Sequence, residues 1–310
     1  GGVSAEARTL HWHVANLEYG CAASLGRVSL CWWDQDDENT LGGDHCVVSD
    51  GFDRIIQGLA THSEVLTQHV VSSIEYGPDA VTVHTRGGGE GITADAVLVT
   101  VPLGVLKAKT IKFAPPLPSW KRNAIEAIGF GPIEKVVLLF GSPFWDVSVD
   151  FFGCLPPATA APAELPKLRG EFFMFWNLQR SHGVPALTCI SSGAYAETSW
   201  RSLSHRSIAS AALSVLSRTF GDQVHSLFKR SIVTDWGGNP FCRGSYSYVG
   251  VGASGADYDE LARPVGGRVF FAGEATHGQH PATATGAYLS GLREAQRIDQ
   301  AHRAGFPVVS

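Results

Sequence analysis

The spacing of apolar positions along the chain predicts a mixture of helices and strands. Apolar residues recur at three- and four-residue steps over 5–20 and over 205–220, the period of an amphipathic helix. Further helical patterns cover 51–60, 121–130 and the longer C-terminal stretch 283–305. Alternating or continuous apolar runs instead predict strands. They occur as two strands with a glycine turn after residue 72, then at 96–101, 134–140, 171–178, 186–196, 231–236 and 268–276.

These elements alternate without a strict period, and the chain has no internal repeat. The expected fold class is therefore α/β, mixed with α+β character, with domains that are discontinuous in sequence. Residues 151–170, rich in Pro and Ala, are expected to form a surface loop.

Residues 250–255 spell G-x-G-x-x-G, the pattern of a dinucleotide-binding turn, and Glu274 follows near the distance expected of a ribose-binding acid. Such a turn must open a long helix after its last glycine. Here Pro264 limits that helix to at most two turns. We therefore interpret 250–255 as a flexible loop that joins two domains.

The segment 268–298 carries a stronger cofactor signal. A strand delivers Gly273 and Glu274 to its carboxyl end, where α/β proteins bind ligands. Thr283 and Ala284 then begin a helix whose first N–H groups favour a negatively charged oxygen or an electron-rich ring. An ordinary strand–loop–helix without a ligand remains the alternative on these residues alone.

Composition narrows the function further. The chain has 310 residues, 44% apolar and 17% charged, with a formal net charge of −5 and no block of Lys or Arg. It therefore lacks the basic patch of a direct nucleic-acid binder, and an acidic balance suits a cationic substrate. The six cysteines form no C-x-x-C pair and no metal-like spacing, so we expect free buried thiols and no metal site. No apolar run approaches the length of a membrane span.

The stretch FFAGEAT…PATATGAYLSGLREA resembles the C-terminal flavin-binding signature of the FAD-dependent amine oxidases. Other stretches are similar to the lysine-specific histone demethylase branch, with a plant-like GGDHC, and the likeness extends over about residues 9–300. They include WHVANLEY (12–19), WDQDD (33–37), GGDH (42–45) and RGSYSYV (243–249).

The resemblance implies a two-domain FAD-dependent amine oxidase fold with interleaved subdomains. Substrate-binding ranges would be 1–39 and 132–255, and FAD-binding ranges 40–131 and 256–310. The family's N-terminal βαβ unit with its true glycine fingerprint has no counterpart in residues 1–50. The chain thus resembles the C-terminal two-thirds of the oxidase, and we expect it to bind FAD weakly and to be inactive by itself.

The resemblance also assigns roles to individual residues. Lys135 would be the main catalytic group, because the matching lysine in the family holds a water over the flavin N5; a lysine at the start of a strand is otherwise usually solvated. Positive charge and a donor there would stabilise a ring that becomes electron-rich on reduction. Cofactor contacts would come from Val71, Thr100, Pro102, Trp236, Tyr246, Gly273, Glu274, Thr283 and Ala284.

Substrate contacts would come from Asn16, Asp36, Asp37, His45, Trp176 and Tyr246. Aromatic faces suit a methylammonium, and clustered carboxylates suit a histone tail rich in Lys and Arg. Each has a plainer alternative: core aromatic residues, a solvated acidic turn at 36–38, and a structural role for His45.

The activity implied is oxidative demethylation of mono- and dimethyl-lysine on a histone H3 tail, giving lysine, formaldehyde and hydrogen peroxide. The implied cofactor is FAD, the implied partners are the H3 tail and a corepressor or chromatin complex, and the implied location is the nucleus. Two alternatives stay open: a polyamine oxidase, and a catalytically inactive chromatin scaffold that keeps the fold.

Overall fold

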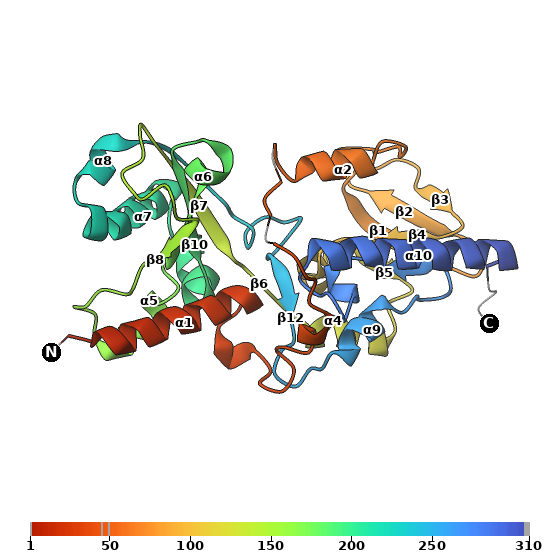
Figure 1. Cartoon of the computed structure of the whole chain (residues 1–310). Coiled ribbons are helices and arrows are strands. Elements are labelled where there is room, and N and C mark those ends of the chain that lie inside the picture. Colours follow the sequence, from red (N-terminus) through yellow and green to blue (C-terminus); the bar gives the residue numbers. More distant parts are fainter. Residues whose placement is uncertain (1, 45, 49, 307–310) are drawn as a thin grey trace. The chain divides into compact units, whose positions relative to one another are not determined.

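The computed structural model describes residues 2–44, 46–48 and 50–306 (Figure 1), and structural statements below refer to these residues. The fold is mixed α/β, as predicted. Contacts divide the chain into two compact units, each assembled from segments distant in sequence. Unit 1 comprises 1–34, 102–104 and 127–254, and unit 2 comprises 35–101, 105–126 and 255–310. The predicted subdomain ranges alternate in the same order, and their assignment to substrate or FAD stays a prediction.

Unit 1 is built on a five-stranded antiparallel sheet. Its strand order is β11 (Phe228–Val233), β7 (Glu134–Phe140), β10 (Ala186–Ser191), β9 (Met174–Asn177) and β8 (Phe151–Gly153). Side chains along β7 alternate between buried and half-buried, so the sheet has two different faces. The buried side chains Val136, Leu138 and Phe140 belong to the main hydrophobic core.

Helix α7 (His205–Phe220) supplies the opposite side of that core. Ser204 caps its N-terminus by accepting from the Ser207 N–H, and Gly221 follows its last residue. Ile208, Ala212 and Leu216 recur at four-residue steps and are buried. Each fully buried Ile or Leu stabilises the unit by about 1.5–3 kcal/mol, so the predicted apolar stripe is what fixes α7 on the sheet.

The other face of this sheet is covered only in part. Met174 and Ile190 lie on it and pack with Ala15 of helix α1 (Ala5–Cys21) and with Ala22, which follows that helix. Ala22 ends α1 in the left-handed conformation at φ 50°. A Cβ added at Gly131 would collide with the Ala22 carbonyl oxygen, so glycine is required where these segments meet.

Unit 2 contains a four-stranded sheet and a separate parallel pair. The strand order of the sheet is β3 (Ile92–Ala94), β2 (Val81–Thr85), β1 (Val71–Tyr76) and β5 (Lys112–Ala114). The parallel pair joins β4 (Val97–Val99) to β13 (Val269–Phe271). Helix α10 (Ala284–Ala304), blue in Figure 1, is the long helix of this unit.

A buried lysine connects two helices of unit 2. Lys121 of α4 (Ser119–Ala127) is 0% exposed. Its Nζ donates to the carbonyl oxygens of Glu260 (3.1 Å), Leu261 (2.6 Å) and Arg263 (2.5 Å) at the end of α9 (Ala256–Ala262). The last carbonyl oxygens of a helix lack the N–H donors of a following turn, and the Arg263 N–H reaches only that of Glu260, so Lys121 caps α9. The short α9 agrees with the prediction that the helix after 250–255 has at most two turns.

Helix α2 (Asp53–Leu59) has no buried residue. Its apolar residues Phe52, Ile55, Ile56 and Leu59 recur at the period of a helix and form a stripe, yet each is between 41% and 57% exposed. The periodicity therefore predicted the helix correctly, but within the described residues nothing covers its apolar stripe.

The remaining elements are short. They are β6 (Gly129–Gly131) and β12 (Tyr246–Tyr248), which pair with each other, α3 (Leu103–Lys107), α5 (Leu165–Leu168), α6 (Leu178–His182) and α8 (Gln223–Leu227). No helix of the described residues is both long and apolar enough to span a membrane.

Three predictions were wrong in part. The strand expected at 186–196 ends at Ser191, and a helical turn covers Tyr195–Ser199. The expected surface loop at 151–170 contains β8 and α5 and buries Leu165, because β8 pairs with β9 and draws the segment onto the core. The six cysteines form no disulfide in the described part of the chain, but Cys31 and Cys46 are exposed rather than buried.

Candidate functional site

In unit 2, the parallel pair brings two predicted cofactor residues to one edge. Val99 lies opposite Phe271 in the register, and the Ala272 N–H donates to the Val99 carbonyl oxygen at 3.1 Å. Thr100 and Gly273 follow directly, so both lie where the two strands end. This carboxyl edge is where α/β folds place ligands.

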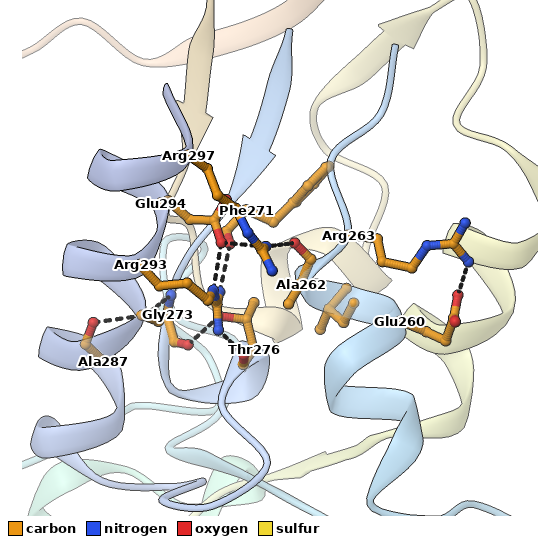
Figure 2. A network of polar contacts seen from close by, with 12 residues as sticks. Glu260, Ala262, Arg263, Phe271, Gly273, Thr276, Ala287, Arg293, Glu294 and Arg297 are labelled. Atoms are coloured by element: carbon orange, nitrogen blue, oxygen red, sulfur yellow. Dashed lines mark hydrogen bonds and ion pairs between the residues drawn. The ribbon is translucent and has the colours of Figure 1, made fainter. Parts of the chain in front are cut away.

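The turn at Gly273 exposes backbone rather than side chains. Gly273 has φ +131°, and a Cβ added there would meet no atom within 4 Å. Its N–H donates to the Ser290 hydroxyl at 2.9 Å, and that hydroxyl donates to the Ala287 carbonyl oxygen at 2.7 Å (Figure 2). The turn is thereby fixed to α10 while the space beside its backbone stays open, as a closely approaching cofactor requires.

Glu274 and the N-terminus of α10 form the next part of this edge. The Glu274 carboxylate accepts from the Ala282 N–H at 2.7 Å, and the Thr283 hydroxyl accepts from the Gly286 N–H at 2.9 Å. Within the described part of the chain, the N–H groups of Ala284 and Thr285 have no acceptor. These two donors, at the positive end of a 21-residue helix, fit an anionic or electron-rich group such as FAD.

A network of two arginines and one carboxylate lies behind the turn (Figure 2). Arg293 donates to the carbonyl oxygens of Phe271 (3.2 Å) and Thr276 (2.6 Å). Glu294 is 0% exposed and accepts from Arg293 at 2.5 Å and from Arg297 at 2.8 Å. The network joins β13, the turn and α10. No sequence pattern singles out these three charged residues.

In unit 1, the sheet register places two predicted site residues on one face. Lys135 lies opposite Ile190, and Trp176 lies opposite Thr188, which is two residues before Ile190 in β10. Burial lowers the pKa of Lys135, and its ammonium has no hydrogen-bond or ion-pair partner among the described residues. The Trp176 Nε1 is also buried without a partner in that part of the chain. Two unused donors on one sheet face are typical of a ligand site.

Residues 131–135 are hydrogen-bonded to residues 234–246. The Lys135 N–H donates to the Thr234 hydroxyl at 2.8 Å, and the Thr234 N–H donates to the Lys135 carbonyl oxygen at 2.9 Å. Trp236 follows two residues later. The structure thus brings the segments of Lys135 and Trp236 together, as a shared site requires.

The same contacts extend to Tyr246. The Ser245 hydroxyl bonds to both the N–H and the carbonyl oxygen of Ile133, at 2.9 and 3.0 Å. The Tyr246 hydroxyl donates to the Tyr19 carbonyl oxygen, and burial strongly raises the pKa of this phenol, so it stays neutral. Since its hydroxyl is engaged, Tyr246 can offer a ligand mainly the face of its ring.

Glu134 is the residue that sequence reasoning missed. It is 0% exposed and accepts from the Thr234 hydroxyl (2.6 Å), the Trp236 N–H (3.2 Å) and the Gly237 N–H (2.9 Å). Its only signal in the sequence is an acidic residue immediately before a lysine at the start of an apolar strand.

The other predicted residues are more dispersed. Asn16 is exposed on α1 of unit 1, whereas Asp36 and Asp37 lie in unit 2 at a 3₁₀ turn. Val71 begins β1 half-buried, and Pro102 is exposed after β4. His45 lies outside the described residues. No group of three or more His, Cys, Asp or Glu that could hold a metal occurs in the described part of the chain.

Comparison with known proteins relates these features to a family. A family profile described as "Flavin containing amine oxidoreductase" matches residues 5–299. A solved structure of putrescine oxidase bound to putrescine is similar over 81% of this chain and 53% of that one, with a TM-score of 0.65 and 20% identity. At that identity the likeness shows the fold alone.

Curated relatives are more similar in sequence. "Lysine-specific histone demethylase 1 homolog 3" of Arabidopsis thaliana is 45% identical over 97% of this chain and 18% of its own length. "Lysine-specific histone demethylase 1 homolog 2" and "Protein FLOWERING LOCUS D" of the same plant are 44% and 42% identical, each over 95% of this chain. The chain spans 38% and 36% of these two proteins.

The family match confirms what the C-terminal signature predicted. It covers both units and includes the turn at Gly273 and the start of β7. FAD is the cofactor that this family implies, and the donors at the N-terminus of α10 fit it. The chain therefore belongs to the flavin-containing amine oxidoreductases.

Proposed function

We propose that this chain is part of an FAD-dependent histone demethylase that oxidises mono- and dimethyl-lysine in a histone H3 tail. Its relatives at 42–45% identity include two plant proteins named as lysine-specific histone demethylases. The observation that carries the proposal is the unpartnered, half-buried Lys135 on the same sheet face as Trp176. A nuclear location and a chromatin complex belong to the same proposal.

FAD, when bound, supplies a two-electron oxidation that removes a hydride from the N-methyl carbon, after which water releases formaldehyde and oxygen becomes hydrogen peroxide. The Lys135 ammonium offers a proton donor at the place where negative charge develops during the reaction. Because a buried site excludes water, it stabilises that charge more strongly than an exposed lysine would. The reacting nitrogen must keep a lone pair, so trimethyl-lysine is not a substrate.

Three aromatic side chains and several cofactor contacts complete the assignment. Trp176, Trp236 and Tyr246 bind the methylammonium through their ring faces, which attract a weakly hydrated cation. The same Trp236 and Tyr246 also contact the cofactor, which is held in addition by Val71, Thr100, Pro102, Gly273, Glu274, Thr283 and Ala284.

The histone tail is bound by a polar set separate from the chemistry. Asp36 and Asp37 pair with its Lys and Arg side chains, and Asn16 and His45 add polar contacts. These contacts orient the tail, which raises the effective concentration of the methylated lysine without changing the reaction itself.

The decisive test replaces Lys135 in the flavin-loaded protein. Lys135→Ala should lower the rate of peroxide release from a dimethyl-lysine peptide by about 10²–10³-fold while flavin absorbance is retained. Lys229→Ala is the matched control, because Lys229 is an exposed lysine on the neighbouring strand β11 of the same sheet. Turnover by Lys135→Ala equal to that control would exclude the role.

A polyamine oxidase is the second candidate, because such an enzyme shares the C-terminal flavin signature and an acidic balance suits its cationic substrate. It would use the same Lys135 and aromatic faces on a flexible polycation. Parallel peroxide assays with a dimethyl-lysine H3 peptide and with spermine separate the two, since turnover of spermine alone would favour this candidate. No peroxide from either amine would favour the inactive scaffold.

A further inference from the structure

Glu134 is a buried carboxylate held entirely by neutral donors. Its side chain is 0% exposed, and no ion pair to it occurs among the described residues. One carboxylate oxygen, Oε2, accepts from the Thr234 hydroxyl at 2.6 Å and from the Trp236 N–H at 3.2 Å. The other, Oε1, accepts from the Gly237 N–H at 2.9 Å. A charge buried without a cation is unusual and needs an explanation.

We propose that Glu134 is a positioning residue for amine oxidation: its carboxylate fixes the turn 234–237 against the start of β7 and so sets the places of Trp236 and Lys135. The inference rests on the proposed function for the roles of Trp236 and Lys135.

The donors explain why a carboxylate stands at this position. Two consecutive N–H groups, of Trp236 and Gly237, point at two different oxygen atoms. A glutamine has one oxygen, so its amide nitrogen would face one of these N–H groups, donor against donor. Charge-assisted bonds to both oxygens are shorter and stronger than neutral ones, which narrows the range of positions open to the turn.

The Thr234 hydroxyl extends this control to Lys135. It donates to Glu134 and accepts from the Lys135 N–H at 2.8 Å, so one hydroxyl connects the carboxylate to the backbone of the predicted catalytic lysine. Orientation by Glu134 fixes which lone pair of the hydroxyl meets that N–H.

The backbone of Trp236 is also hydrogen-bonded on the side away from Glu134. The Gly244 N–H donates to the Trp236 carbonyl oxygen at 2.9 Å, so the Trp236 backbone is bonded on both sides. Its side chain is nevertheless 43% exposed. A fixed backbone carrying a projecting indole is an arrangement that aims a side chain at a ligand rather than filling a core.

The test compares Glu134→Gln with a core variant of the same strand. Leu138 lies on the same face of β7, is 0% exposed and belongs to the main core, so Leu138→Ala weakens unit 1 without touching the turn. In amide hydrogen exchange on the full-length flavin-loaded protein, Glu134→Gln should speed exchange at Trp236 and Gly237 at least tenfold more than Leu138→Ala does. Equal exchange at these amides in both variants would overturn the proposal.

The second readout separates positioning from mere stability. In stopped-flow reduction of the bound flavin, Glu134→Gln should slow the limiting rate about 10–100-fold, because small misplacements of catalytic groups have effects of that size. KM should change by a smaller factor than the limiting rate, since Trp236 contributes to binding whereas Lys135 acts in the chemical step. Thr234→Ser, which keeps the hydroxyl, should resemble the wild type, whereas Thr234→Val should resemble Glu134→Gln. Faster exchange with an unchanged reduction rate would make Glu134 purely structural and refute the inference.

Failure of the proposed substrate is distinguishable from failure of this inference. If the wild type reduces its flavin with spermine but not with dimethyl-lysine peptides, the demethylase proposal is wrong. The same variants are then compared on spermine, and the tenfold or greater loss for Glu134→Gln is still required.

Discussion

On the sheet face of unit 1 that carries Lys135 and Trp176, folding leaves single polar groups without a hydrogen-bond partner among the described residues. The Trp176 Nε1 is buried, yet no acceptor for it occurs among the described residues. Its ring lies 5.4 Å from that of Phe151, which fixes the indole by packing alone. A buried donor without an acceptor destabilises a fold by about 1–3 kcal/mol, so a bound substrate that accepts this N–H would gain from it.

Trp176→Phe keeps an aromatic ring and removes this donor. We expect the free energy of unfolding to change by less than about 1 kcal/mol, because removal of an unsatisfied donor offsets the lost ring area. KM for the methylated peptide should rise about fivefold, the effect of one hydrogen bond. Urea unfolding and steady-state kinetics measure the two quantities; a loss of several kcal/mol with unchanged KM would show that Trp176 only fills space.

Sequence reasoning singled out Lys135 but not Glu134, and the role of Lys135 stays a prediction. A lysine at the start of a strand is ordinarily solvated, so only the family resemblance singled out Lys135. The role of Glu134 depends on its hydrogen bonds with Thr234, Trp236 and Gly237. These residues lie about 100 positions later in the chain, so no local pattern in the sequence predicts the contacts.

At the scale of elements, local patterns predicted α7 and α10 well, because each has a cap residue within its own sequence and α7 also has an apolar stripe. They failed at β8, whose three residues become a strand only by pairing with β9. The cap of α9 is equally non-local. Lys121 reaches its C-terminus from 139 positions earlier in the chain and also lies 4.1 Å from the Phe271 ring centroid.

This cap makes the stability of unit 2 depend on pH. Burial lowers the pKa of Lys121 to about 7, with the neighbouring Glu294 opposing that shift. An unfolded lysine keeps its proton up to about pH 10.4. Between these values the unfolded state binds more protons, so this residue adds stability as pH rises, by at most about 1.4 kcal/mol per pH unit.

Lys121→Met lacks this titration. From pH 7 to pH 9, the free energy of unfolding of the wild type, measured with urea, should therefore increase more than that of Lys121→Met. Lys109→Met serves as the control, because Lys109 is exposed and forms a surface ion pair with Glu126. A difference between wild type and Lys121→Met that is the same at both pH values would contradict the assigned cause.

At the scale of the whole molecule, each unit is assembled from three segments of the chain. Periodicity in the sequence gives elements but not their membership of a unit. The interleaved ranges were therefore predicted from the family resemblance, not from hydrophobic patterns. In the described part of unit 2, β4 and β13 pair with each other and with no further strand. The 250–255 glycines lead into a seven-residue helix.

The 310-residue chain by itself should hold FAD weakly. The N-terminus of α10 offers donors to the cofactor, but no strand–GxGxxG–helix unit for the pyrophosphate occurs in the sequence. Flavin absorbance of the purified chain after dialysis measures this directly. A stoichiometric flavin spectrum would show that the donors around Gly273 and α10 suffice.

The uncovered stripe of α2 has a consequence for handling the protein. The apolar stripe consists of Phe52, just before α2, and Ile55, Ile56 and Leu59 within it. Each of these side chains is between 41% and 57% exposed to solvent. With a net charge of only −5, electrostatic repulsion between copies is modest. Sulfate and other kosmotropic salts strengthen hydrophobic association, so they act against solubility here. The 310-residue chain is therefore best purified at low protein concentration in low-salt buffer, where aggregation through this stripe is slowest.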